Sequence, residues 1–303
     1  MGGIMAQAKV NGLQIEYETF GEKSKPALLL IAGLGAQLIY WQKEFCIQLA
    51  DKGYFVIRFD NRDTGLSTKI EELTAPELME KIGGFFMGKK SSVPYGFDEM
   101  AGDAVGLLDA LNIEKAHIVG KSMGGYIAQT LCINHPDRVL SLTSIFSHTG
   151  KLSAFQPTQE VLEVMLTPAP EDREGFIEHM VKLFKVTYGT GIPFDEEFHK
   201  NLVGNSFDRC CFREGVMRHY LAILSQRNRT EDLQKINVPA LIIHGDDDPL
   251  IPLAGGQATA DAIPNSKLKI IKGMGHVMPN LDTYWSDILN AMVDHIKKLK
   301  VKK

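Results

Sequence analysis

The chain has 303 residues, of which 44% are hydrophobic and 23% charged, and its formal net charge at pH 7 is −4. This composition is that of a globular protein, long enough for one large domain or for one domain with an insertion. We expect no nucleic-acid partner, because phosphate binding needs clustered Lys and Arg. Only the C-terminal tail is locally basic, and we interpret it as a solvated helix end.

Cysteine usage and the N-terminus indicate the compartment. The four cysteines form no CxxC pair, so free thiols in a reducing environment are the default expectation. The adjacent Cys210 and Cys211 leave a vicinal disulfide as the less favoured alternative. Residues 1–10 lack the basic start and apolar run of a signal peptide. No apolar stretch approaches the roughly 20 residues of a membrane span. We therefore expect a cytoplasmic protein with no membrane span.

Short apolar runs alternate with amphipathic segments in the first half of the chain, which predicts α/β architecture. The apolar runs are bounded by turn residues and the amphipathic segments have helical spacing. In chain order we predict a strand at 27–32, a helix at 41–52, a strand at 54–59, a helix at 100–111, a strand at 116–119, a helix at 124–134 and a strand at 139–145.

The pattern changes from about Ser147 to about Glu231, where strand-like runs are absent and Phe, Met and charged residues recur at helical spacing. We predict a helical cap over 148–230, inserted into a core domain made of 1–147 and 231–303. Strand signals return at 240–244 and 267–271, and the last helix is predicted at 283–298. A core interrupted by a cap predicts one doubly wound, mostly parallel sheet.

The strongest local signal is the sequence Gly-Lys-Ser-Met-Gly-Gly at 120–125, which matches G-x-S-x-G. It follows a predicted strand and opens a predicted helix, the context that this nucleophile motif requires. A sharp turn would expose the hydroxyl of Ser122 above the sheet. Residues two before and two after the serine would crowd each other, and Gly120 and Gly124 remove that clash. We predict Ser122 as a nucleophile.

Two phosphate-binding interpretations of these glycines fail on spacing. A P-loop ending in Gly-Lys-Ser would need glycine at position 115, which is Lys115. A dinucleotide fingerprint starting at Gly33 would need its third glycine at position 38, which is Leu38. A plain tight turn is the remaining structural alternative.

A serine hydroxyl needs a base, and the chain has nine histidines. His276 directly follows the glycines Gly273 and Gly275 in a predicted loop after the last strand, and catalytic side chains concentrate on such loops. His244 ends a strand beside an acidic turn and is the most credible rival. We predict His276 as the base, with activity falling at acid pH because a protonated imidazole cannot accept the serine proton.

The acid should lie between serine and histidine in the chain. The turn at 245–252 offers Asp246, Asp247 and Asp248, and a G-x-x-D pattern with proline close behind favours Asp248. The other two aspartates are expected to cap the turn or face water. A calcium loop starting at Asp246 would need Asp or Asn at position 250, which is Leu, so we predict no metal site.

Two backbone N–H groups are predicted to form the oxyanion hole. One is that of Met123, directly after the serine, and the other comes from the loop after strand 27–32. We favour Leu34, because the glycines on both sides of it allow a close approach of the backbone.

These motifs occur in the order found in the α/β-hydrolase superfamily, which the chain resembles along nearly its whole length. The segment Arg-Phe-Asp-Asn-Arg-Asp-Thr-Gly-Leu-Ser at 58–67 resembles the family's D-x-R-G-x-G-x-S turn, and its Arg-Asp-Thr-Gly form is similar to the aclacinomycin methylesterase-like branch. The resemblance implies carboxylic ester hydrolysis through an acyl-enzyme, without a cofactor. One departure is Ala32 before Gly33, where the family usually has His-Gly.

Aromatic and Met side chains give the predicted cap an apolar character, so a minority of them should line a pocket for a hydrophobic acyl or aromatic ester. The alternatives within the fold are a C–C bond hydrolase, a lactonase and a cofactor-free perhydrolase. A non-catalytic small-ligand receptor is the alternative from another class, and whether the chain forms a homodimer stays open. The apolar cap residues are Phe155, Met165, Phe176, Met180, Phe184, Phe207, Phe212 and Met217.

Overall fold

The computed structural model describes residues 3–89, 92–278 and 283–300. In this part of the chain a sheet of eight strands lies at the centre, in the order β1-β2-β4-β3-β5-β6-β7-β8. The first two strands pair antiparallel with each other, β2 pairs antiparallel with β4, and all later pairs are parallel. The strands are β1 (Ile4–Val10), β2 (Leu13–Phe20), β3 (Ala27–Ile31), β4 (Phe55–Phe59), β5 (Ala116–Lys121), β6 (Val139–Ile145), β7 (Ala240–Gly245) and β8 (Lys267–Ile271).

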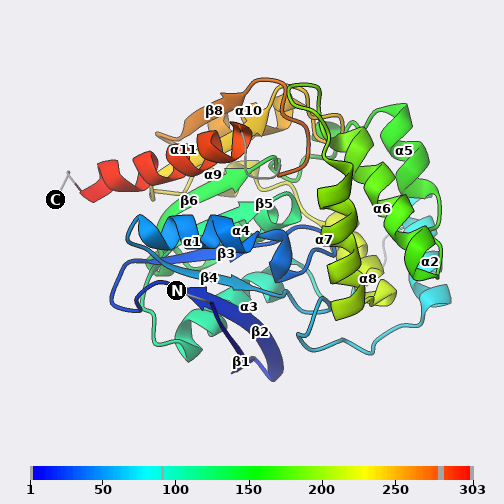
Figure 1. The fold of residues 1–303 in the computed structure, drawn as a ribbon, viewed down its shortest axis with the longest axis horizontal. Helices are drawn as coiled ribbons and strands as arrows, with labels where there is room; N and C mark the ends of the chain where they lie inside the picture. Colours follow the sequence, from blue (N-terminus) through cyan, green and yellow to red (C-terminus); the bar gives the residue numbers. More distant parts are fainter. Residues whose placement is uncertain (1–2, 90–91, 279–282, 301–303) are drawn as a thin grey trace.

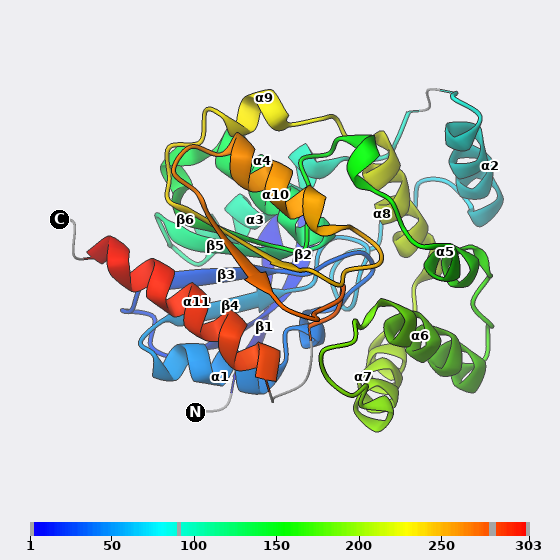
Figure 2. The same cartoon turned by 90° about the horizontal axis from the view of Figure 1, so that it is seen from above.

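Helices cover both faces of the sheet. Figure 2 shows α1 (Lys43–Asp51) and α11 (Thr283–Lys300) on one face, and α3 (Phe97–Ala110), α4 (Met123–Asn134) and α10 (Leu253–Ala262) on the other. Each face has its own apolar core, and β3, β4 and β5 are buried along their whole length. Burial on both sides is why these strands consist mainly of apolar residues, as in other parallel sheets. The short helices are α9 (Thr230–Leu233) and the 3₁₀ turns at Leu38–Tyr40, Pro136–Arg138 and Leu152–Ala154.

A helical insertion lies between β6 and β7, at one end of the sheet (Figure 1). It contains α5 (Gln159–Leu166), α6 (Arg173–Thr187), α7 (Glu196–Arg209) and α8 (Arg213–Ser225). A small apolar cluster of its own, centred on Ile177, Val181 and Val203, holds α6 and α7 together. One further helix, α2 (Ala75–Phe86), packs against α8, although it comes from the segment between β4 and β5.

The predicted fold class is confirmed: a doubly wound, mostly parallel sheet with helices inserted after its sixth strand. The predicted strands and helices are present, and two of them, β6 and β8, have the predicted bounds. The β1–β2 hairpin, α2 and α10 are elements for which the sequence analysis made no prediction. All four cysteines are free thiols, so Cys210 and Cys211 are not joined. No helix among the described residues has the length and apolar character to cross a membrane.

Candidate active site

Ser122 stands at the sharp turn between β5 and α4. Its backbone is in the left-handed half of φ/ψ space, with φ 53° and ψ −123°, a conformation that costs free energy in any residue but glycine. The turn is tight because its flanks touch. A Cβ atom on Gly120 would lie 2.0 Å from the carbonyl oxygen of Gly124, and one on Gly124 would lie 2.2 Å from that of Ile31. Both positions therefore require glycine.

Three side chains from three loops converge on this turn. The hydroxyl of Ser122 donates to Nε2 of His276 over 2.8 Å, and Nδ1–H of His276 donates to Oδ2 of Asp248 over 2.7 Å. Ser122 follows β5, Asp248 follows β7 and His276 follows β8, so all three lie where parallel strands end. This edge of an open α/β sheet is the one at which ligands bind. The structure thus brings together the three side chains that the sequence analysis singled out.

The carboxylate of Asp248 is fixed on both oxygens. Oδ1 accepts the N–H groups of Leu250 and Ile251 at 2.9 and 2.8 Å, and Oδ2 accepts from His276. Burial by itself would raise the pKa of this carboxyl, but the pairing with His276 and the nearby His244 holds the pKa well below its usual range. Asp248 therefore stays ionised and can keep the imidazole of His276 in one orientation.

The rival histidine, His244, is fully buried and points its Nε2 elsewhere. It donates to the carbonyl of Ile251 at 2.8 Å and lies 3.4 Å from Oδ2 of Asp248. His244 thus contacts the acid but not the serine. Near the same centre, burial lowers the pKa of His148 to about 3, and its Nδ1 accepts the N–H of Gly150.

The other two aspartates of the acidic turn accept backbone N–H groups, and Asp246 is also exposed to solvent. Asp246 accepts the N–H of Gly273 at 2.6 Å, and Asp247 accepts the N–H of Thr190 at 2.7 Å. The first bond anchors the loop that carries His276, and the second ties the turn to the segment after α6. No group of three or more His, Cys, Asp or Glu side chains within the described ranges is placed to hold a metal ion.

The end of α6 also holds the histidine loop through its backbone. The N–H of His276 donates to the carbonyl of Thr187 at 2.6 Å, and the N–H of Gly275 donates to that of Tyr188 at 2.9 Å. A Cβ atom on Gly189 would lie 2.4 Å from the nitrogen of Gly275, so the two segments are in backbone contact. The inserted helices thus take part in placing His276.

Of the two predicted oxyanion donors, Met123 directly follows Ser122, and Leu34 belongs to a loop that lies against Ser122. Met123 is the first residue of α4, and the first N–H groups of a helix have no acceptor within it. Leu34 lies in the loop after β3, and a Cβ atom on its neighbour Gly33 would be 3.3 Å from Cβ of Ser122. The loop is a turn in which the N–H of Ala36 donates to the carbonyl of Gly33 at 3.2 Å. Gly35 has φ 61° at its third position, as in a type II turn.

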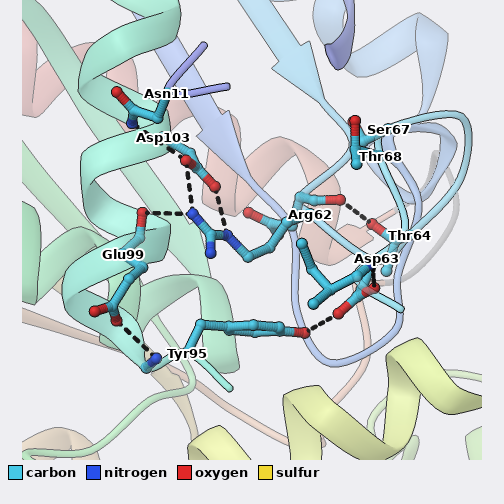
Figure 3. A network of polar contacts seen from close by, with 12 residues as sticks. Asn11, Arg62, Asp63, Thr64, Ser67, Thr68, Tyr95, Glu99 and Asp103 are labelled. Carbon is cyan, nitrogen blue, oxygen red and sulfur yellow. Dashed lines mark hydrogen bonds and ion pairs between the residues drawn. The ribbon is translucent and has the colours of Figure 1, made fainter. Parts of the chain in front are cut away.

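The segment at 58–67 is held by a polar network that the sequence analysis did not anticipate. Figure 3 shows the guanidinium of Arg62 against the carboxylate of Asp103, with N–O distances of 2.7 and 2.8 Å, and the hydroxyl of Tyr95 donating to Asp63. Asn61 donates to the carbonyl of Ala32 at 3.2 Å. The segment therefore braces the loop after β3 at Ala32, the residue before Gly33.

Two buried ion pairs join this segment to the inserted helices. Arg218 on α8 lies 2.8 Å from Asp63, and both side chains are at most 1% exposed. Arg209 at the end of α7 lies 2.7 Å from Asp60, whose side chain is fully buried. The charged residues of the helical segment were the available signal, but nothing in their spacing identifies which aspartate each would reach.

A family model of the α/β hydrolase fold matches residues 26–279. The chain belongs to the α/β-hydrolase family.

Two relatives of the chain are, by name, an esterase and a lactonase. The chain is 31% identical over 283 residues to rhodomycin D methylesterase DauP of Streptomyces sp. strain C5, covering 86% of this chain and 88% of that protein. It is 28% identical over 270 residues to 3-oxoadipate enol-lactonase 2 of Acinetobacter baylyi, covering 85% of each. The methylesterase-like branch of the α/β-hydrolase family is thus supported.

A solved structure agrees on the fold. The crystal structure of a putative lipase from Acinetobacter baumannii superposes with a TM-score of 0.76 over 100% of this chain and 93% of that one, at 20% sequence identity. At this identity the likeness concerns the α/β-hydrolase fold, and the inserted helices belong to the part of the chain that is covered.

Proposed function

We propose that this α/β hydrolase is a serine esterase that cleaves carboxylic esters with a hydrophobic acyl or aromatic part through an acyl-enzyme. The observation that carries the proposal is the pair of hydrogen bonds that link Ser122, His276 and Asp248 in one line, at 2.8 and 2.7 Å. A serine hydroxyl that is hydrogen-bonded to a histidine, which is in turn hydrogen-bonded to an aspartate, can act as a nucleophile at neutral pH. The methylesterase relative supports an ester of a carboxylic acid with a small alcohol.

In the acylation step, Oγ of Ser122 attacks the ester carbonyl carbon while His276 Nε2 takes the hydroxyl proton. The carbonyl oxygen becomes an oxyanion, which the N–H groups of Leu34 and Met123 would stabilise. The tetrahedral intermediate collapses, the C–O bond to the alcohol breaks, and His276 returns its proton to the leaving oxygen. Asp248 remains ionised throughout and stabilises the imidazolium.

In the deacylation step, water replaces the alcohol. His276 removes a proton from the water as its oxygen attacks the acyl carbon, and a second oxyanion forms at the same donors. Collapse breaks the bond to Oγ, His276 protonates Ser122, and the carboxylic acid leaves. Besides the ester and water, both steps use only groups of this chain.

We further propose that residues 148–230 act as a cap over a core of 1–147 and 231–303 and shape the substrate pocket. Three contacts support this division of roles. The end of α6 binds the histidine loop, and α7 and α8 reach the 58–67 segment through Arg209 and Arg218. The apolar rings of the cap, such as Phe184 beside Tyr40 at 6.1 Å between centroids, suit a hydrophobic acyl group.

The test uses 4-nitrophenyl acetate and butyrate with the wild type and Ser122→Ala. We expect hydrolysis by the wild type and a fall of kcat by about 10⁴-fold or more in Ser122→Ala, since the nucleophile acts as a unit with its base. Circular dichroism and the melting temperature of the variant report whether the fold is intact. Full activity of a folded Ser122→Ala would refute the proposal.

A lactonase is the second candidate, favoured by the enol-lactonase relative. The same serine would open a cyclic ester, so the chemistry of the triad does not distinguish the two. A panel of methyl esters of aromatic acids and of lactones, assayed for acid release with and without peroxide, separates esterase, lactonase and perhydrolase. The esterase proposal predicts the highest kcat/KM on the open-chain esters.

A further inference from the structure

Helix α8 lies directly on two loops of the core, one after β3 and one after β4. A Cβ atom on Gly215 would be 2.2 Å from the carbonyl oxygen of Asp63, and one on Gly35 would be 2.9 Å from Cγ2 of Val216. The backbone of α8 at Gly215 and the side chain of Val216 therefore pack directly against the two loops. The position of α8 therefore determines which of its side chains can reach the turn that contains Leu34.

One of these side chains, His219, is fully buried and bridges the two loops. Its Nδ1 accepts the N–H of Gly35 at 3.3 Å, and its Nε2–H donates to the carbonyl of Arg62 at 2.9 Å. Because one nitrogen must accept and the other must donate, the ring is the neutral Nε2–H tautomer. Burial lowers the pKa of His219 to about 4, which keeps it in that form at neutral pH.

The residue that accepts from the imidazole and the helix that carries the ring are both anchored. Arg62 is fixed by its two bonds to Asp103, which Figure 3 shows. The preceding residue on α8, Arg218, is paired with Asp63 over 2.8 Å. The ring of His219 is therefore held between a rigid acceptor on one side and a turn of the core on the other.

The bond to Gly35 constrains the peptide unit next to the predicted oxyanion donor. The N–H of Gly35 belongs to the Leu34–Gly35 peptide, and only the Cα of Leu34 separates that unit from the Leu34 N–H. A donor in an oxyanion hole must be aimed within a few tenths of an ångström and about 10–20° to be effective. We propose that His219 of α8 is a positioning residue that aims the Leu34 N–H at the reacting oxygen. This inference rests on the proposed acyl transfer at Ser122.

His219 makes two hydrogen bonds, and two substitutions can test them one at a time. In His219→Asn the amide oxygen stands where Nδ1 stood and can still accept from Gly35. In His219→Gln the amide nitrogen stands near the place of Nε2 and can donate to Arg62, but the acceptor for Gly35 is lost. Both variants remove the ring, and both leave a neutral polar side chain in the same site.

Kinetics on 4-nitrophenyl butyrate and inhibition by phenylboronic acid, which forms a tetrahedral adduct with a serine, give the readouts. For His219→Gln we expect kcat to fall about tenfold with KM changed less than about twofold, a partial loss compared with the 10²–10³ of a deleted donor. The inhibition constant for the boronic acid should rise by a similar factor. In His219→Asn both values should return to within about threefold of the wild type.

The control is His179→Ala, which removes a half-buried histidine of α6 elsewhere in the cap and should change neither readout. Equal losses in the Asn and Gln variants, or an unchanged kcat in His219→Gln, would overturn the inference. If neither variant folds, ¹⁵N-histidine NMR of the wild type decides: a His219 ring protonated on Nδ1 at pH 7 contradicts the bond to Gly35. Failure of the proposed function would show separately, as an active Ser122→Ala.

Discussion

At the scale of single residues, the backbone of Ser122 shows that the sharp turn between β5 and α4 is strained. A φ of 53° with ψ −123° is a conformation that residues with a Cβ atom avoid. The same turn places the hydroxyl 2.8 Å from Nε2 of His276 and puts the first N–H groups of α4 beside it. The strained residue is thus the one whose hydroxyl the proposed chemistry needs exposed. Strained backbone conformations cluster at active sites in general.

The strain can be measured with two inactive variants. Ser122→Ala keeps the Cβ atom and Ser122→Gly removes it, so both abolish the nucleophile while only the second relieves the backbone. We expect Ser122→Gly to be more stable than Ser122→Ala by about 1 kcal/mol in the free energy of unfolding, despite the greater freedom of glycine in the unfolded chain. Urea denaturation of the pair measures this difference. A more stable Ser122→Ala would show that the turn is not strained.

At the scale of elements, the strands and helices that carry the site could be predicted because they bury continuous apolar runs or one apolar face. The β1–β2 hairpin could have been predicted as well. Asn11-Gly12 forms its two-residue turn, with φ values of 50° and 83°, and Asn-Gly between alternating strands is the typical signal. The capping box of α2, Thr74 with Glu77, is a second signal that was present in the sequence.

Helix α10 could not have been found in the same way. Its buried residues are small, among them Gly255, Gly256 and Thr259, so it has no apolar stripe. Its glycines allow close packing against β7: a Cβ atom on Gly256 would lie 2.4 Å from Nδ1 of His244. The ion pairs between the inserted helices and the 58–67 segment could not be predicted for a related reason, since they depend on tertiary contacts that no local pattern encodes.

A buried and an exposed ion pair should differ sharply in their effect on stability. Arg218→Ala leaves Asp63 as an uncompensated buried charge, and we expect a loss of about 3–5 kcal/mol in the free energy of unfolding. The matched control is Arg173→Ala, whose pair with Asp208 has both side chains about half exposed. Solvent screens that pair, so the free energy of unfolding should hardly change. Equal losses in the two variants, by urea denaturation, would contradict the assignment of Arg218–Asp63 as a structural pair.

At the scale of the whole molecule, Ser122, His276 and Asp248 come from loops at one edge of the sheet, and the inserted helices bind two loops at this edge. The histidine loop is bonded to the end of α6, and the turn with Leu34 is bonded to α8. Sequence motifs predicted which residues meet, because the edge of a parallel sheet brings strand ends together. They did not predict that the inserted helices support these loops, since backbone carbonyls make the contacts at α6 and carry no sequence signature.

Stability should respond to pH through the buried histidine of α8. With a pKa of about 4 in the folded state against 6.5 for a freely solvated imidazole, His219 is neutral when folded and protonated when unfolded near pH 5. The unfolded state then binds more protons, so acidification from pH 7 to pH 5 costs stability. We expect the wild type to lose about 2 kcal/mol more than His219→Asn over this range. Urea denaturation at both pH values tests this, and equal losses would show that His219 is already accessible to protons when folded.

The proposed hydrolytic mechanism depends most on Ser122 being the nucleophile that His276 activates. The direct measurement is mass spectrometry of the chain after reaction with a fluorophosphonate, with the modified peptide mapped and the rate of labelling followed in the wild type and in His276→Ala. We predict one adduct, on the peptide that contains Ser122, formed at least 10²-fold more slowly without the imidazole. An adduct on another residue, no adduct, or an equal rate in His276→Ala would contradict the account.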